Sequence, residues 1–152
     1  MDQSLAARNR HPVQLFALVV GATFLLVGIL GFIPGITTHL YGGLDFAGHD
    51  SRAKLLGLFQ VSVLHNIVHL LFGVAGIALA RTWETARAYL TIGGVIYLAL
   101  WLYGLIVSKG SGANFVPLNT ADDWLHFVLG IGMIALGFAT TRERNVARTT
   151  PA

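Results

Sequence analysis

Four long apolar runs alternate with polar segments along the chain. They cover about residues 13–33, 55–80, 88–107 and 122–141. A helix needs roughly 20 residues to cross the ~30 Å hydrocarbon core of a bilayer, and each run has about that length. The pattern therefore predicts an all-α polytopic membrane protein. We expect an antiparallel bundle of four transmembrane helices that forms a single domain over residues 1–152.

The second run carries the most unusual polar residues. It holds Gln60, Asn66 and two histidines, but no Lys, Arg, Asp or Glu between residues 55 and 80. Polar side chains at membrane depth are costly and usually face protein or water rather than lipid. His65 and His69 are four residues apart, so a helix places them on one side. We therefore expect a polar cluster inside the bundle, near the middle of this span.

Each run also has one helical face of small or polar residues. In the second run this face reads Ser62, Asn66, His69, Gly73, Gly76 and Ala80. In the first run it reads Gln14, Ala17, Gly21, Phe24, Gly28, Gly31 and Gly35. Small residues let helix backbones approach closely in lipid. These faces predict the surfaces through which the helices pack.

The third and fourth runs add further polar side chains at depth. Tyr97 and Trp101 lie far from either end of the third run, so the hydroxyl and the indole NH need partners, and the histidines of the second run are candidates. His126 lies about one turn inside the fourth run. Just before it, Thr120 and Asp123 have the spacing of a capping box, which predicts a helix start.

Composition and charge narrow the function classes. The chain is 55% hydrophobic and 11% charged, with a net charge of +3 and no cysteine. The basic residues stand at the ends of apolar runs, as membrane topology places them, and not on one basic face, so nucleic-acid binding is excluded. Without cysteine there is no disulfide, thiolate or iron–sulfur chemistry. The expected partners are the lipid bilayer and either another membrane protein or a second copy of the chain.

Two blocks of the sequence carry a family resemblance. They are LLGLFQVSVLHNIVHLLFGVAGIALAR and GANFVPLNTADDWLHFVLGIGMIALG, with GGVIYLALWLYGL between them. Their motifs are His65-Asn66-x-x-His69 and Asn114-Phe115-x-Pro117-x-Asn119-x-x-Asp122-x-x-x-His126. Over about residues 12–141 the chain resembles the domain-of-unknown-function 4383 family, small bacterial integral membrane proteins with four predicted spans. The resemblance implies a four-span fold in the plasma membrane and no particular activity.

The histidines raise the question of a metal or haem site. The spacing of His65 and His69 lets two imidazoles reach one metal ion, and His126 and Asp122 are candidate further ligands. A zincin motif needs Glu after the first histidine, where this chain has Asn66, so a metalloprotease is excluded. A haem b with two histidine ligands requires His65 or His69 on one face and His126 on the other. The alternative is a structural polar cluster without a cofactor.

Helix register places such a site between the second and fourth spans, toward the end where both spans begin. We expect His65 and His126 to be closest and His69 to lie beneath them. Asp122 or Asp123 is then a candidate to orient the ring of His126, as carboxylates do for ligating imidazoles.

The segment before the fourth run contains a second candidate feature. Pro117 fixes a turn, while Asn114 and Asn119 are residues that terminate turns and helices through side-chain hydrogen bonds. We interpret this segment as a loop-to-helix cap. The functional alternative is a lid over His65 and His126.

Three hypotheses for function remain open at this point. The first is a non-enzymatic accessory or assembly subunit, or a homo-oligomer, that acts through helix packing at its glycine-rich faces. The second is a membrane metal- or haem-binding protein. The third is a small transporter or proton conduit, with relay groups at Gln60, His65, His69, Tyr97 and Asp122. The absence of a carboxylate deep in a span disfavours transport.

We predict that both chain termini lie in the cytoplasm and that residues 35–54 and 109–121 lie outside. Basic residues concentrate at the termini and the 81–87 connection: Arg8, Arg10, Arg81, Arg87, Arg142, Arg144 and Arg148, against Arg52, Lys54 and Lys109 in the two long loops. Such a bias sets orientation by the positive-inside rule. Reporter fusions at residues 45, 84, 115 and 152 measure it, and an external signal at residue 84 would reverse the orientation.

Overall fold

Four long helices make up most of the computed structural model, which describes residues 10–139. They are α1 (Pro12–Leu30), α3 (Val63–Leu79), α4 (Trp83–Ile106) and α5 (Thr120–Phe138). By length and composition, α1, α4 and α5 are able to cross a membrane, and α3 is a shorter apolar helix of 17 residues. At 1.5 Å per residue α3 is about 25 Å long, somewhat less than the hydrocarbon core. A mostly helical architecture is confirmed, and the crossing of the membrane by all four helices stays a prediction.

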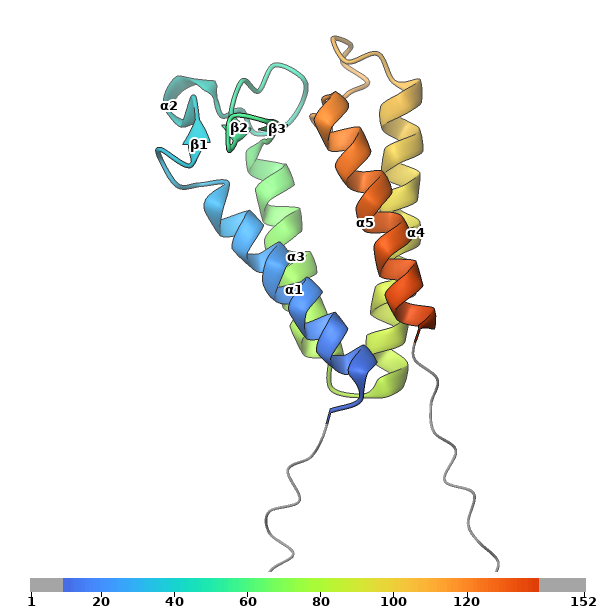
Figure 1. Ribbon diagram of the computed structural model, residues 1–152. Coiled ribbons are helices and arrows are strands. Elements are labelled where there is room, and N and C mark those ends of the chain that lie inside the picture. Colours follow the sequence, from blue (N-terminus) through green and yellow to red (C-terminus); the bar gives the residue numbers. More distant parts are fainter. Residues whose placement is uncertain (1–9, 140–152) are drawn as a thin grey trace, which may run out of the picture.

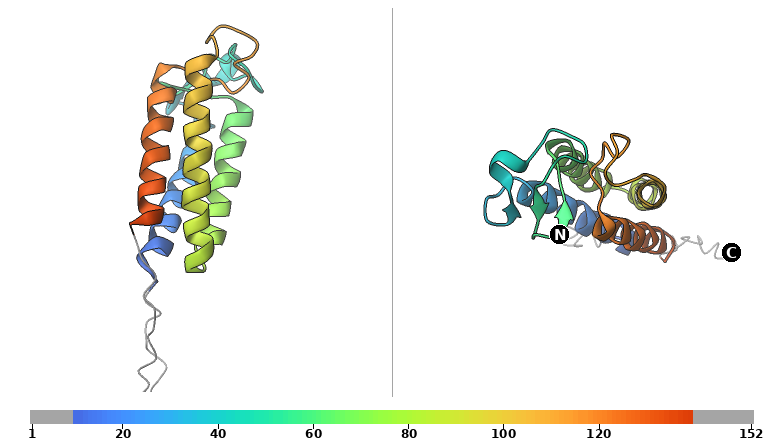
Figure 2. Two further views of the ribbon diagram at one scale, coloured as in Figure 1. Left: turned by 90° about the vertical axis from the view of Figure 1, so that its right-hand side faces the viewer. Right: turned by 90° about the horizontal axis from the view of Figure 1, so that it is seen from above.

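The helices form two antiparallel pairs. Helix α1 packs along α3, and α4 packs along α5 (Figure 1). The start of α1, the connection between α3 and α4 and the end of α5 lie at one end of the molecule, which we call the turn end. Residues 31–62 and 107–119 lie at the other, which we call the loop end (Figures 1 and 2). The pairs diverge toward the loop end.

Glycines bring α1 and α3 into direct backbone contact. A Cβ atom at Gly21 would lie 2.8 Å from the nitrogen of Ile77, and one at Gly73 would lie 2.5 Å from the nitrogen of Leu25. The helices approach this closely only because both positions lack a side chain. The glycine-rich face of the first run is therefore a packing surface, as predicted, but it packs against α3 within the same chain.

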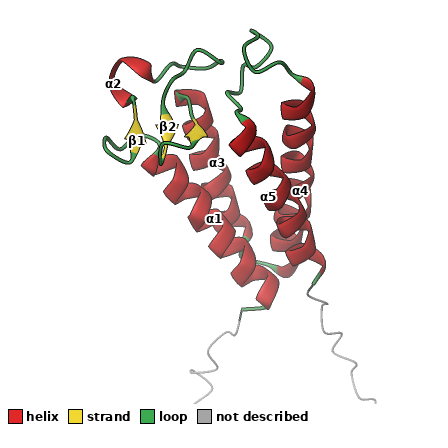
Figure 3. Ribbon diagram, turned by 45° about the horizontal axis from the view of Figure 1, so that its top comes forward, coloured by secondary structure: helices red, strands yellow, loops and turns green. Residues whose placement is uncertain are grey.

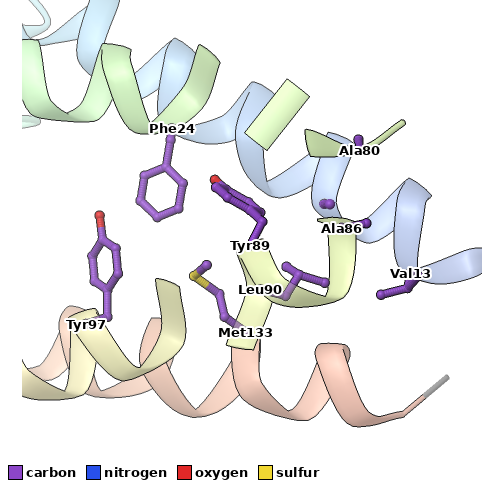
Figure 4. Packing of buried hydrophobic residues seen from close by; sticks show 9 residues of the cluster. Val13, Phe24, Ala80, Ala86, Tyr89, Leu90, Tyr97 and Met133 are labelled. Atoms are coloured by element: carbon purple, nitrogen blue, oxygen red, sulfur yellow. The ribbon is translucent and has the colours of Figure 1, made fainter. Parts of the chain in front are cut away.

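A similar contact joins the second pair, and aromatic side chains fill the space between the pairs. A Cβ atom at Gly94 in α4 would lie 2.7 Å from the carbonyl oxygen of Gly130 in α5. Large buried side chains from three helices meet between the pairs (Figure 4). They include Phe24 of α1, Tyr89, Leu90 and Tyr97 of α4, and Met133 of α5.

A small antiparallel sheet lies at the loop end (Figure 3). Its strands are β1 (Thr37–Thr38), β2 (Lys54–Leu55) and β3 (Phe59–Gln60), in that order across the sheet. The short segment α2 (Leu40–Gly43) lies between β1 and β2 in the sequence. The sheet occupies residues that the sequence pattern assigns to the beginning of the second span.

The second span therefore begins later than predicted, at Val63 instead of residue 55. Leu56 and Gly57 have positive φ angles of 54° and 70°, which turn the chain between β2 and β3. The side chain of Ser62 then accepts a hydrogen bond of 3.1 Å from the backbone nitrogen of His65 and starts the helix. His65 consequently lies in the first turn of α3 and not near the middle of a span.

The other three long helices also differ from the prediction at their ends. Helix α1 ends at Leu30, three residues before the predicted position 33. Helix α4 begins at Trp83, five residues before position 88, because the side chain of Thr82 accepts a hydrogen bond from the backbone nitrogen of Thr85. The α3–α4 connection is thus only residues 80–82. Helix α5 ends at Phe138. The predicted continuation to residue 141 reaches beyond the described residues, as do Arg8 and the arginines of the C-terminal tail.

We expect Gly73→Ala to destabilise the protein, because the added methyl group would lie 2.5–2.8 Å from backbone atoms of α1. Overpacking of this kind costs about 1–3 kcal/mol. Gly132→Ala is a matched control in α5, since no atom lies within 4 Å of an added Cβ there. Thermal unfolding in detergent micelles measures both variants. Equal melting temperatures for Gly73→Ala and the unmodified protein would contradict the backbone contact of α1 with α3.

Candidate functional site

A cavity of about 170 Å³ lies between the two helix pairs near the loop end. Its polar lining consists of Ser62, His65, His69, Tyr97 and His126. Its apolar lining consists of Leu64, Val68, Leu100, Phe115 and Val116. The structure thus brings the three candidate histidines together around one space, with Tyr97 from the predicted polar group.

The cavity lies close to the molecular surface beside α3. Two of its lining residues, Val68 and Phe115, are 51% and 55% exposed, whereas His126 is only 3% exposed. Val68 belongs to the apolar outer face of α3, and Phe115 belongs to the loop before α5. A molecule entering beside Val68 would come from the side of the bundle.

The late start of α3 sets the depth of the histidines. His69 and His126 are each the seventh residue of their helices, which both begin at the loop end. At 1.5 Å per residue they lie about 9 Å from the helix starts, with His65 one turn nearer the loops. The sequence-based register pairs His65 with His126 by depth. The observed helix starts give His69 and His126 a similar depth, and the expectation that His65 lies closest to His126 stays a prediction.

Aromatic rings connect the histidines across the bundle. The ring centroids of His65 and His69 are 4.5 Å apart, and Phe24 lies 5.5 Å from His69. Phe24 stacks on Tyr97 at 5.2 Å (Figure 4). The ring of Tyr97 meets His126 at 5.2 Å in an edge-on geometry. All four long helices contribute to this chain of rings, so the packing of the whole bundle positions each imidazole.

The three imidazoles differ in their hydrogen bonds. Nδ1 of His69 donates to the carbonyl oxygen of His65 at 3.0 Å. Nδ1 of His65 and Nδ1 of His126 are buried and have no hydrogen-bond partner among residues 10–139. Such an unsatisfied polar atom costs about 1–3 kcal/mol, and native proteins usually satisfy it with a ligand or an ordered water. These nitrogens are unused hydrogen-bonding groups on two residues that line the cavity.

The carboxylates of Asp122 and Asp123 bond to groups other than the ring of His126. Oδ2 of Asp122 accepts hydrogen bonds from the backbone nitrogens of Asn119 at 2.9 Å and Gln60 at 3.1 Å. Asp123 forms an ion pair with Lys109, with an Nζ–Oδ2 distance of 2.6 Å. The prediction that Asp122 or Asp123 orients the ring of His126 is therefore wrong. Asp122 also does not line the cavity.

The Asp123–Lys109 pair ties the end of α4 to the start of α5. Nζ of Lys109 also donates to the carbonyl oxygen of Gly104 at 2.7 Å. A Cβ atom at Gly104 would collide with the carboxylate of Asp123, so glycine is required there. Because Asp123 is 4% exposed, its charge depends on the lysine for compensation.

The two long loops bond to each other at the loop end, and Phe115 and Val116 of the second loop line the cavity. The side-chain amide of Asn119 donates to the carbonyl oxygen of Leu58 at 2.7 Å, and Asp122 accepts from Gln60 as described. The backbone nitrogen of Gly48 donates to the carbonyl oxygen of Phe115 at 2.8 Å. We call residues 54–60 together with 107–119 the lid.

The capping box at the start of α5 is shifted by one residue from its predicted position. Oδ1 of Asn119 accepts from the backbone nitrogen of Asp122 at 3.0 Å, and Asp122 returns a bond to the backbone of Asn119. The predicted pair, Thr120 with Asp123, has the same spacing. Asparagine is at least as good an N-cap as threonine, and Asp123 is taken by Lys109.

The Asn114–Asn119 motif forms the turn and helix cap predicted for it. Asn114 is 1% exposed, accepts from the backbone nitrogen of Leu118 at 3.2 Å and donates to the carbonyl oxygen of Lys109 at 3.0 Å. Pro117 is also buried. Because Phe115 and Val116 between them line the cavity, the same segment is part of the lid.

Three residues of the predicted polar group lie away from the cavity. Gln60 belongs to β3, where its side chain bonds to loop carbonyl groups. Asn66 donates to the carbonyl oxygen of Gly31 at 2.9 Å, within the α1–α3 contact. Trp101 packs on Phe127, and its Nε1 has no partner among the described residues, so the predicted bond to a histidine of the second run is wrong.

The sequence pattern assigned Phe24 to a packing face and Phe115 and Val116 to a loop, and it did not mark any of the three as a neighbour of the histidines. Phe24 had one available signal, since it is the large residue in an otherwise glycine-rich face of the first run. A bulky side chain there has to fill space that the glycines leave open. No comparable signal marks Phe115 and Val116, because their contact with the cavity depends on how the loop folds back.

The volume of the cavity and the metal-ligating side chains around it limit which cofactor the site is able to hold. Among residues 10–139, no group of three or more His, Cys, Asp or Glu side chains is arranged to hold a metal ion. An engineered cavity of about 150 Å³ holds one benzene molecule, so a space of about 170 Å³ does not fit the four pyrrole rings of haem b. The metal hypothesis stays a prediction without a complete ligand set.

The fold and the cavity define a helical membrane protein with a small lined site between two helix pairs. A family model described as a domain of unknown function (DUF4383) matches residues 14–139. The chain therefore belongs to the DUF4383 family, as the two sequence blocks indicated. Comparison with curated proteins and with solved structures gives no match.

We expect Asn119→Ser to release the hairpin of residues 54–60 while α5 stays capped. Serine is a good N-cap but lacks the amide that donates to Leu58. Hydrogen exchange at the Gln60 amide should rise, with little change in the unfolding midpoint. Asn119→Ala loses the cap as well, which costs about 1 kcal/mol more. Unchanged exchange in both variants would show that this bond does not hold the lid.

Proposed function

We propose that the protein is a non-enzymatic membrane protein that binds one small, neutral, lipid-soluble molecule in the cavity. The ligand chemistry that fits is a single ring with a hydroxyl or carbonyl group, as in phenols and quinone head groups. The observation that carries the proposal is the buried Nδ1 atom of His126, which has no partner in the described chain.

The volume of the cavity supports a ligand of one ring. At about 170 Å³ it is close to the engineered cavity that holds benzene. That engineered cavity is lined only by apolar side chains and stays dry, whereas this one has three imidazoles and a phenol on its wall. A hydroxyl or carbonyl group on the ring gives an unpaired imidazole nitrogen its hydrogen bond, and the rest of the ring contacts Leu64, Leu100 and Val116.

The charge of the lining supports a neutral ligand. The lining residues include no Lys, Arg, Asp or Glu. A charged group buried there would lack a counter-charge, which is expensive in an interior of low dielectric. Imidazole serves a neutral ligand well, because its ring nitrogens donate or accept according to the tautomer.

The position of the cavity beside α3 supports entry from the bilayer. Val68 is exposed on the apolar face of α3, where the helix would contact acyl chains. At the loop end, the lid is held by the Asn119–Leu58 and Gly48–Phe115 bonds. A ligand dissolved in the membrane reaches the cavity without breaking those bonds.

We infer that the turn end lies in the cytoplasm and the loop end outside, in the plasma membrane of a bacterium. The charge bias of the whole chain supports this orientation. The start of α1 and the end of α5 lie at the same end of the bundle, which agrees with this orientation (Figure 1).

The hypothesis of an assembly subunit or homo-oligomer rests on the glycine-rich face of α1, and α3 already covers that face. Gly21, Gly28 and Gly31 face α3, and a Cβ atom at any of them would collide with that helix. An assembly partner would therefore have to use a different surface.

We expect phenol to bind more tightly than toluene, a molecule of similar size without a polar group, and His126→Leu to remove that preference. One hydrogen bond is worth about 0.5–1.5 kcal/mol, so phenol should lose roughly threefold to tenfold in affinity while toluene is unaffected. NMR titration of ¹⁵N-histidine-labelled protein in nanodiscs measures both binding and the shift of Nδ1 of His126.

Two further variants test the location of the site. His49→Gln changes a histidine on the long loop outside the cavity and should leave binding unchanged. Val68→Phe should obstruct entry beside α3 and weaken both probes without altering a histidine. Equal binding of phenol and toluene to the unmodified protein would refute the proposal. Stoichiometric Zn²⁺ binding that His126→Leu abolishes would support the metal hypothesis in its place.

A further inference from the structure

A second concave surface lies at the turn end, far from the histidine cavity. It is a groove of about 1110 Å³ along α1 and α3. Its lining includes Leu18, Val74 and Ile77 on the helices and Arg10 and Arg81 at the ends of those helices. The groove is thus apolar along its length and cationic at its mouth. We call it the arginine groove.

The two guanidinium groups of the arginine groove are exposed and unpaired within the described chain. Neither Arg10 nor Arg81 forms an ion pair with a described residue, since the ion pairs of residues 10–139 are His49–Asp50 and Lys109–Asp123 at the loop end. Glu84 is the acidic residue at the turn end among residues 10–139, and it does not line the groove. The mouth therefore presents two positive charges.

A glutamine holds the two sides of the groove in place. Nε2 of Gln14, in the first turn of α1, donates to the carbonyl oxygens of Ala80 at 3.3 Å and Arg81 at 2.6 Å. This bond fixes the α3–α4 connection against the start of α1, so Arg81 is positioned before any ligand arrives. It also occupies two carbonyl oxygens that would otherwise face an incoming anion.

The helix ends at the turn end carry partial charges of both signs, so the arginines supply the net positive charge of the mouth. The N-termini of α1 and α4 both lie at the turn end, and each carries a partial positive charge. The C-terminus of α3 opposes them with a partial negative charge. The C-terminus of α5 lies at this end as well.

We propose that the arginine groove binds one anionic phospholipid, with its phosphate between Arg10 and Arg81 and one acyl chain along Leu18, Val74 and Ile77. Arginine suits this role because its planar fork matches phosphate oxygens. An amphipathic groove at the level of the head groups fits a lipid better than a soluble anion, because Val74 and Ile77 are 55% and 39% exposed and gain contact with a chain. This site is independent of the histidine cavity at the opposite end.

The test is native mass spectrometry of the full-length protein with phosphatidylglycerol and phosphatidylcholine of identical acyl chains. We expect one phosphatidylglycerol to be retained in preference to phosphatidylcholine. Each juxtamembrane arginine contributes about fivefold to such binding. Arg10→Gln with Arg81→Gln should therefore reduce retention of phosphatidylglycerol roughly twentyfold or more and leave phosphatidylcholine unchanged.

Arg87→Gln is the matched control at the same end. The guanidinium of Arg87 packs on the rings of Trp83 at 5.2 Å and Phe138 at 4.8 Å, outside the groove. An equal loss of phosphatidylglycerol in Arg87→Gln would overturn the proposal, because general surface charge would then explain the binding. So would undiminished retention in the double variant.

Two more measurements separate a lipid from a free phosphate and a binding defect from a folding defect. Ile77→Asn should weaken phosphatidylglycerol but not glycerol phosphate. Competition by glycerol phosphate at the same concentration as the lipid would overturn the lipid assignment. Arg81→Lys keeps the charge but loses the planar fork, so it should retain less lipid than the unmodified protein and more than the double variant, with an unchanged melting temperature. A loss of lipid in Arg81→Lys as large as in the double variant would contradict a charge-based site.

Discussion

The backbone contact between α1 and α3 is the constraint on which the rest of the structure depends. Gly21 and Gly73 allow the two helices to approach until backbone meets backbone, and no large side chain fits between the helices at that level. The large residues of these helices must then project elsewhere. Phe24 and His69 do so toward the second pair, where Tyr97 and His126 meet them. Tight packing within each pair thus leads to an aromatic layer, and a cavity, between the pairs.

The cavity owes its position to the point at which α3 begins. Ser62 starts the helix one turn before His65, and the preceding residues form a hairpin where a longer helix would have continued. That hairpin bonds to Asn119 and so reaches the segment that lines the cavity. Because α3 begins only at Val63, α3 is short, the preceding residues form the sheet, and the sheet contacts the lid.

The two ends of the bundle have different chemistry, and a bilayer explains the difference. At the loop end, the buried carboxylate of Asp123 is paired with Lys109, and the cavity is lined by neutral groups. At the turn end, Arg10 and Arg81 stay exposed over an apolar groove. Neutral ligands dissolved in the membrane suit the first site, and anionic lipid head groups suit the second.

Periodicity alone determined the helices and the faces through which they pack, because small residues such as Gly21, Gly73 and Gly94 have few other uses in an apolar helix. It also placed His65, His69 and His126 in one region. Only the tertiary structure decided that residues 54–60 form a hairpin, because a short apolar run is compatible with a buried strand as well as with a helix. It alone decided that Asp122 bonds to Gln60 and not to His126, because that bond joins segments 62 residues apart. The local sequence determines the spacing of apolar and small residues in a helix. Contacts between distant segments determine where the helix ends and which groups it bonds to.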